Sequence, residues 1–330
     1  MILLTAETDA ATLESIRRAL PDADVVHRPS SFGWTAAQLL SLVHDADAVL
    51  AGGDEYTERV LAHAPRLRIL ARLGVGFDKV DVTAAERLGI YVTSTPGANS
   101  VAVAELAIGL ILAMARDVVG HAVDVKQNRW APSFGTQLEG QTLGLIGSGA
   151  IGSEVLKRAL AFGMKVRVHD PFVSVDRIRS AGGTPSSLGD TLAEADFLSL
   201  HLPLSAATRG YLNRERIATV KRGCMLVNTA RGDLIDEDAL LEALNTGRIK
   251  AAALDVLRSE PPSGASGLLA HHPSTIVVPH IGAATREASN RTYALAIESV
   301  ARAFAGERPP RAINDPLRPR NATPRVAAQP

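Results

Sequence analysis

Short apolar runs alternate with segments of helical apolar spacing along the first hundred residues of the 330-residue chain. Runs of four or five apolar residues are typical of strands buried in a parallel sheet, and apolar residues three and four apart are typical of helices that face a core. The predicted strands are 2–5, 24–27, 48–51, 67–71 and 91–94, and the predicted helices are 11–19, 35–43, 57–63 and 82–87. This alternation predicts a parallel sheet.

The alternation returns after residue 140, where six more strands are predicted at 143–146, 165–169, 195–200, 224–228, 251–254 and 275–278. Between the two series stands helix 101–115, which is apolar all round and therefore needs burial on several sides. An irregular arm that contains Trp130 follows this helix. We expect this region to form a subunit interface, in which Trp130 either anchors the contact or packs locally.

A last helix, 287–305, is expected to pack on the first series of strands, because six strands already complete a doubly wound fold. The pattern predicts an α/β protein of two doubly wound, Rossmann-like parallel-sheet domains. The inserted domain covers 98–285, and a discontinuous, flavodoxin-like domain covers 1–97 and 286–315. The proline-rich residues 316–330 are expected to be disordered.

Composition narrows the class of protein. With 35 basic and 35 acidic residues the net charge is zero, which gives no electrostatic reason to expect nucleic acid or an anionic membrane as partner. The single cysteine, Cys224, fits a reducing compartment. The N-terminus lacks the features of a signal peptide, and 101–115 is too short to span a bilayer. These features together predict a cytoplasmic protein. His271 and His272 lack a third ligand, so no metal site is expected.

A glycine-rich turn joins the strand 143–146 to a segment of helical spacing. Gly147 permits the tight turn, Gly149 leaves room for a pyrophosphate, and Gly152 lets helix and strand pack closely. Asp170 ends the next strand, where a carboxylate would accept from a ribose 2′-OH and repel a 2′-phosphate. No arginine stands at 171–173, so the turn predicts NAD rather than NADP. The alternative is an ordinary strand–helix turn with fortuitous glycines.

Three polar residues follow later strands of the second series, at ends that share one edge of a doubly wound sheet. His280 suits a general base for the hydroxyl proton of a secondary alcohol, and Glu260 would fix its tautomer. Arg231 offers a planar fork to a substrate carboxylate. The alternatives are a surface pair of Arg231 with Asp233, a solvated Glu260 and a core histidine at 280.

The turn after strand 67–71 carries Arg72, Gly74 and Gly76. Two glycines expose backbone N–H groups, which suit a small carboxylate, and Arg72 adds a cation. The alternative is a tight connection with a surface arginine.

Six motifs resemble the D-isomer-specific 2-hydroxyacid dehydrogenases, in the phosphoglycerate-dehydrogenase-like branch, over about residues 45–315. The motifs are Leu73–Asp78, Pro96–Ser100 leading to Val103–Glu105, the 147–152 turn, Asn228–Gly232, Leu254–Val256 with Glu260–Pro261, and Pro279–Ala283. The resemblance implies Arg231, Glu260 and His280 as catalytic residues. It implies a homodimer through 100–140 and hinges near 97 and 286.

The resemblance also implies two sets of contacts. The cofactor NAD would touch Val103, Gly147, Gly149, Ala150, Ile151, Gly152, Asp170, His201, Leu202, Pro203, Thr208, Thr229, Ala230, Arg231, Asp255, His280 and Gly282. The substrate would touch Arg72, Leu73, Gly74, Val75, Gly76, Asn99, Arg231 and His280.

The predicted function is hydride transfer between NAD(H) and a small-molecule D-2-hydroxy or 2-oxo acid. The acid is 3-phosphoglycerate, with Arg72 or Arg129 meeting the phosphate, or hydroxypyruvate, glyoxylate or a sugar acid. The alternative is an NAD(H)-sensing protein similar to the C-terminal-binding corepressors, which share the fold and bind peptides.

Overall fold

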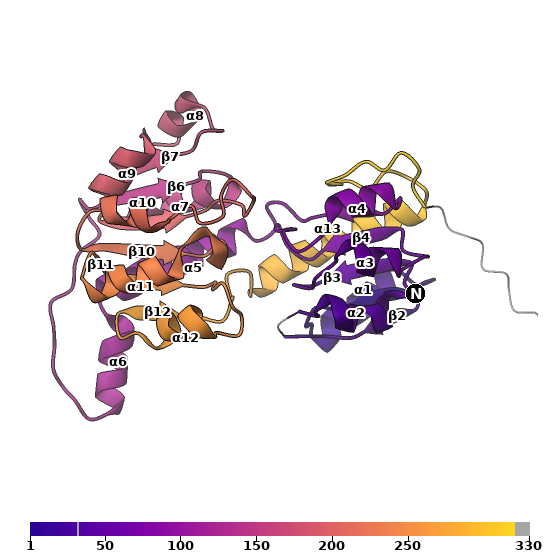
Figure 1. The fold of residues 1–330 in the computed structure, drawn as a ribbon, viewed down its shortest axis with the longest axis horizontal. Helices are drawn as coiled ribbons and strands as arrows, with labels where there is room; N and C mark the ends of the chain where they lie inside the picture. Colours follow the sequence, from indigo (N-terminus) through magenta and orange to yellow (C-terminus); the bar gives the residue numbers. More distant parts are fainter. Residues whose placement is uncertain (32, 321–330) are drawn as a thin grey trace, which may run out of the picture. The chain divides into compact units, whose positions relative to one another are not determined.

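The computed structural model describes residues 1–31 and 33–320 as two compact units (Figure 1). The first unit comprises Met1–Asn99 and the chain from Thr285 onward, and the second comprises Ser100–Ala284. Of the predicted disordered tail, residues 321–330 lie outside the described part. Arg320 packs on the first unit, where its N–H donates to the Gly89 carbonyl (2.9 Å) and its guanidinium to the Ala64 carbonyl (2.6 Å).

The first unit is a five-stranded parallel sheet in the order β2-β1-β3-β4-β5. This is the flavodoxin-like order. Its strands are β1 (Ile2–Leu4), β2 (Val25–His27), β3 (Ala48–Ala51), β4 (Ile69–Arg72) and β5 (Tyr91–Thr93). Its helices are α1 (Ala10–Ala19), α2 (Ala36–Val43), α3 (Glu58–Ala62), α4 (Val82–Arg87) and α13 (Arg286–Phe304).

The central strands β1 and β3 are buried throughout, and successive side chains of a strand point to opposite faces of the sheet. Ile2 and Leu4 pack in one core with Val300 of α13, and Leu3 packs in the other with Leu39 of α2. Helices α1 and α13 therefore cover one face, and α2, α3 and α4 cover the other.

The second unit is a seven-stranded parallel sheet in the order β12-β11-β10-β9-β6-β7-β8. Its strands are β6 (Thr142–Ile146), β7 (Lys165–His169), β8 (Thr184–Pro185), β9 (Phe197–Leu200), β10 (Cys224–Asn228), β11 (Ile249–Leu254) and β12 (Thr275–Val277). Its α-helices are α5 (Ser100–Ala115), α6 (Val118–Lys126), α7 (Ala150–Ala161), α8 (Val175–Ser180), α9 (Leu188–Glu194), α10 (Arg214–Thr219), α11 (Glu237–Asn245) and α12 (Gly264–His271).

Two cores sandwich this second sheet. One core holds buried side chains of α5, α7 and α8, and the other holds those of α9, α10, α11 and α12. The strand order is that of a dinucleotide-binding fold with one added edge strand. The predicted fold class, two Rossmann-like parallel-sheet domains, is confirmed.

Helix α5 is buried largely within its own unit, against α7, β10 and β11. A subunit interface is therefore not needed to explain its apolar character. The arm after α5 contains a helix, α6, that the sequence analysis did not predict, and the arm projects away from the sheet (Figure 1). Trp130 on this arm is 86% exposed and Phe134 is fully exposed, so the alternative of a locally packed Trp130 is wrong.

Two features are absent from residues 1–31 and 33–320. No helix there is both long and apolar enough to cross a membrane. No cluster of three or more His, Cys, Asp and Glu side chains in these ranges could hold a metal ion.

Candidate active site

A histidine and a glutamate meet at the carboxyl-end edge of the seven-stranded sheet. His280 Nδ1 lies 3.0 Å from Glu260 Oε2, and the two side chains are 49% and 37% exposed. The other carboxylate oxygen of Glu260 accepts from the Leu257 N–H at 3.0 Å. The alternative of a core histidine is therefore wrong, whereas Glu260 is exposed and hydrogen-bonded at the same time. One imidazole nitrogen, Nδ1, is held by the carboxylate, and Nε2 takes no part in this contact.

A buried carboxylate shapes the turn that carries His280. Asp255, 2% exposed, follows β11 and accepts from the N–H groups of Ile281 (2.6 Å) and Gly282 (2.9 Å). Burial raises the pKa of the Asp255 carboxyl, and the Ile281 N–H opposes that rise. A side-chain carbon at Gly282 would lie 2.8 Å from Asp255 Oδ2, so glycine is needed there. His280 has a φ of 54°, which is uncommon outside glycine and which this clamp maintains.

Arg231 lies in a loop that Asn228 holds at the end of β10. The Asn228 side chain accepts from the Ala230 N–H (3.0 Å) and donates to the Arg231 carbonyl (2.8 Å). A side-chain carbon at Gly232 would collide with the backbone of Leu257, so this loop touches the loop that carries Glu260.

The predicted alternative for Arg231 was a surface pair with Asp233. Asp233 instead pairs with Arg209 at 2.6 Å and lies 3.8 Å from Arg258. Strands β10, β11 and β12 are parallel neighbours, so the segments that carry Arg231, Glu260 and His280 leave the same edge of the sheet.

The glycine-rich turn has the space and the packing that a dinucleotide needs. Gly147 has a φ of 90°, and a side-chain carbon there would lie 2.6 Å from the His201 carbonyl oxygen. A side-chain carbon at Gly152 would collide with the Gly147 carbonyl. At Gly149, the residue before α7, a side-chain carbon would meet nothing within 4 Å. The turn is therefore closed on the protein side and open where a pyrophosphate would approach.

Asp170 lies beside this turn, at the end of β7. Its carboxylate accepts from the N–H groups of Ser148 (2.7 Å), Phe172 (2.9 Å) and Val173 (3.2 Å), which fixes its position at the mouth of the turn. Thr229, after β10, has a buried hydroxyl without a partner among the described residues. Buried hydroxyls are usually paired, so this group suits a ligand contact. These features fit the predicted cofactor.

His201 follows β9 and is half-buried. Its Nε2 lies 2.8 Å from the Ser199 hydroxyl, and burial lowers its pKa to about 4. In the loop after it, the Thr208 hydroxyl donates to the Pro203 carbonyl at 2.6 Å. Val103 of α5 would lie 3.4 Å from a side-chain carbon at Gly282, which places it beside the histidine turn. Ala150 and Ile151 begin α7, Leu202 follows His201 and Ala230 precedes Arg231.

The predicted substrate loop belongs to the first unit. Arg72 ends β4, and its guanidinium donates to the carbonyls of Gly76 (3.1 Å) and Ala51 (2.8 Å). Arg72 therefore shapes the loop, in which Gly74 has a φ of 155°. Leu73 and Gly74 are partly buried and Val75 is 37% exposed. The Asn99 Oδ1 is buried and unpaired among the residues described here.

Sequence reasoning missed Glu237 and Ser266, which hold the backbone of the Glu260 loop. Glu237 stands in an acidic run, Asp236–Asp238, that looks like an ordinary solvated helix start. No pattern in the sequence distinguishes the buried member of such a run from its exposed neighbours.

Comparison with known proteins identifies the family to which the chain is similar. The family model described as "D-isomer specific 2-hydroxyacid dehydrogenase, NAD binding domain" matches residues 108–282. A D-3-phosphoglycerate dehydrogenase of Methanocaldococcus jannaschii is 40% identical over 288 residues, which are 86% of this chain and 55% of that protein. One of Bacillus subtilis is 39% identical over 277 residues, which are 83% of this chain and 52% of that protein. The chain thus spans about half the length of these curated relatives.

Solved structures agree in fold. A Thermus thermophilus protein is 38% identical with a TM-score of 0.85, over 94% of this chain and 99% of that one. A D-lactate dehydrogenase of Aquifex aeolicus, complexed with NAD and lactic acid, is 29% identical with a TM-score of 0.84, over 93% and 96%. These similarities confirm the predicted family, its phosphoglycerate-dehydrogenase-like branch and NAD as the cofactor. The chain belongs to the D-isomer specific 2-hydroxyacid dehydrogenase family.

Proposed function

We propose that this chain is an NAD-dependent D-2-hydroxyacid dehydrogenase. The observation that carries the proposal is the pair of His280 Nδ1 and Glu260 Oε2, 3.0 Å apart at the edge of the sheet that bears the glycine-rich turn. When bound, NAD supplies a hydride acceptor. The turn at Gly149 would hold its pyrophosphate, and Asp170 its ribose.

The proton and the substrate are assigned to three side chains. Because the Glu260 carboxylate faces Nδ1, that nitrogen carries a proton and Nε2 is the base that takes the hydroxyl proton of the 2-hydroxy acid. Glu260 then stabilises the imidazolium that forms. Arg231 would bind the substrate carboxylate and polarise the carbonyl of the 2-oxo acid in the reverse direction.

The identity of the acid depends on where a cation could meet a phosphate. Arg129 is ion-paired with Asp124, and the Arg72 guanidinium binds two backbone carbonyls. Because both arginines already have partners within the protein, they weaken the case for a phosphorylated substrate. The backbone N–H groups of Val75 and Gly76 would suit a substrate that carries a carboxylate and no phosphate. The proposed substrate class is therefore a small 2-oxo acid, and the test includes acids with and without a phosphate.

A panel of 2-oxo acids with NADH, followed at 340 nm, tests the proposal. The panel contains glyoxylate, hydroxypyruvate, pyruvate and 3-phosphohydroxypyruvate, each with NADPH as the control cofactor. We expect NADH-dependent reduction of at least one acid. Tight NADH binding without turnover of any acid would refute the proposal and support the NAD(H)-sensing alternative, which capture of a peptide partner would then test.

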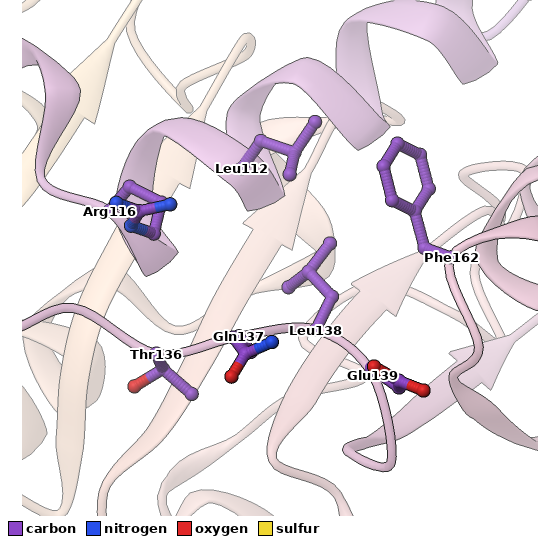
Figure 2. A pocket seen from close by; sticks show the side chains of 7 residues that line it. All are labelled: Leu112, Arg116, Thr136, Gln137, Leu138, Glu139 and Phe162. Carbon is purple, nitrogen blue, oxygen red and sulfur yellow. The ribbon is translucent and has the colours of Figure 1, made fainter.

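We also propose a homodimer through residues 100–140. Four valines of α6 are exposed: Val118 at 54%, Val119 at 46%, Val123 at 43% and Val125 at 52%. At the base of the arm lies a pocket of about 230 Å³ with a mixed lining: Leu112, Leu138 and Phe162 are apolar, and Arg116, Thr136, Gln137 and Glu139 are polar or charged (Figure 2). Exposed apolar surface of this kind is typical of a protein interface.

The oligomeric state tests the dimer. Sedimentation of the wild-type protein should give twice the mass of the chain, and Val123→Asp should give a monomer. A monomeric wild-type protein at micromolar concentration would refute the dimer.

We also propose a cytoplasmic location, because a free cysteine without a disulfide fits a reducing compartment. Burial raises the pKa of the Cys224 thiol to about 12, so the single cysteine is neither a thiolate nor a candidate for a disulfide. Fractionation of cells that express the tagged protein tests this location, and recovery of the protein outside the cytoplasm would contradict it.

A further inference from the structure

The loop that carries Glu260 is held by a hydrogen-bond network that begins at a second, buried glutamate. Glu237 is the first residue of α11 and is 3% exposed. Its Oε1 accepts from the Arg258 N–H at 2.8 Å, and its Oε2 accepts from the Ser266 hydroxyl at 2.5 Å. Both oxygens of this buried carboxylate therefore act on the segment around Glu260.

Three consecutive backbone N–H groups of that segment each donate to a side chain. The Leu257 N–H donates to Glu260 itself, the Arg258 N–H to Glu237 and the Ser259 N–H to Ser266 (3.1 Å). Ser266 in turn donates to Glu237, so two of these three bonds depend on the Glu237 carboxylate.

The location of Glu237 explains why a charged group is stable there. A carboxylate at the first turn of a helix faces unpaired backbone N–H groups and the positive end of the helix dipole. A buried charge must be paired and hydrogen-bonded, and Glu237 receives one backbone and one hydroxyl donor. The neighbouring Asp238 occupies the same first turn but is exposed.

We propose that Glu237 is a positioning residue: through the N–H groups of residues 258 and 259 it fixes the Glu260 carboxylate against His280. This inference rests on the proposed dehydrogenase function, because Glu260 matters only if His280 transfers a proton. Glu237 does not touch the substrate. Its removal displaces the loop, and Glu260 then no longer holds the imidazole at 3.0 Å.

Kinetics of Glu237→Ala and of the matched control Asp238→Ala test the proposal, with the 2-oxo acid that the wild-type enzyme reduces best. We expect Glu237→Ala to lower kcat about 10- to 100-fold, as small displacements of catalytic groups do. The affinity for NADH, measured by fluorescence titration, should stay near the wild-type value. Asp238→Ala should stay within about twofold, as surface substitutions do.

A double-mutant cycle distinguishes positioning from a merely structural effect. In a Glu260→Gln background, adding Glu237→Ala should lower kcat by less than about threefold, because the two residues act as one unit. An equal fold-loss in both backgrounds would overturn the inference. If Glu237→Ala does not fold, Glu237→Gln and Ser266→Ala serve in the same cycle. Glu237→Gln keeps the acceptor for the Arg258 N–H, so it should retain more activity than Glu237→Ala.

The outcomes separate this inference from the proposed function. A wild-type protein that reduces no acid overturns both. An active wild-type protein in which Glu237→Ala behaves as Asp238→Ala does overturns the role of Glu237 alone.

Discussion

Lowering the pH from 7 to 5 should destabilise the seven-stranded unit through His201. Burial lowers the pKa of this histidine from 6.5 to about 4 in the folded protein, whereas the unfolded chain leaves it in water. The unfolded state therefore binds the proton first as the pH falls. The stabilising contribution of the neutral imidazole is complete above pH 6.5 and is lost progressively toward pH 4.

The size of the loss follows from the two pKa values. Each pKa unit corresponds to about 1.4 kcal/mol, so the loss at pH 5 is about 2 kcal/mol and the limit near pH 4 is about 3 kcal/mol. A free energy of this size is a large fraction of the stability of a typical domain.

Urea unfolding followed by circular dichroism at pH 7 and pH 5 measures the effect. The wild-type protein should lose about 2 kcal/mol more over this interval than His201→Gln, which cannot titrate. The exposed His271 of the same unit provides the control, because His271→Gln should lose as much as the wild type. Equal losses in the wild type and in His201→Gln would refute the reasoning.

Two further predictions concern the cofactor. Asp170→Ala should narrow the ratio of kcat/KM with NADH to that with NADPH, because the carboxylate that repels a 2′-phosphate is gone; an unchanged ratio would contradict the assignment of Asp170. Gly149→Ala should fold with a melting temperature near the wild-type value but bind NADH at least about 10-fold more weakly, since its methyl group enters open space needed by the pyrophosphate. Gly152→Ala should instead lower the melting temperature, because its methyl group collides with the Gly147 carbonyl; matching behaviour of the two glycine variants would be the contrary result.

Most strands of the fold were predictable because they contain runs of apolar residues, as in β1, β3, β9 and β10, which are buried throughout. The strand β8 was missed because it has two residues, one of them Pro185, and carries no apolar run. Helix α6 was missed because its valines are exposed rather than spaced along a buried face. The spacing of apolar residues indicates a helix that buries one face within its own unit. It does not identify a helix whose apolar side chains face outward.

The site was predictable where a residue type has few alternative uses. A histidine and a glutamate after parallel strands of one sheet could be expected to converge, and His280 and Glu260 lie in contact. The partners of Arg72 could not be foreseen, because its guanidinium binds backbone carbonyls that no sequence pattern marks. Glu237 could not be foreseen for the same reason, since its partners are the backbone N–H of Arg258 and the hydroxyl of Ser266, which no sequence pattern marks.

The most direct test of the account is single-turnover reduction of the best 2-oxo acid by NADH in His280→Ala, together with the dissociation constant of NADH. Loss of a positioned proton donor should lower the rate by about 10²- to 10⁴-fold, while the dissociation constant stays near the wild-type value. An unchanged rate, with NADH bound normally, would contradict the assignment of proton transfer to the pair of His280 and Glu260.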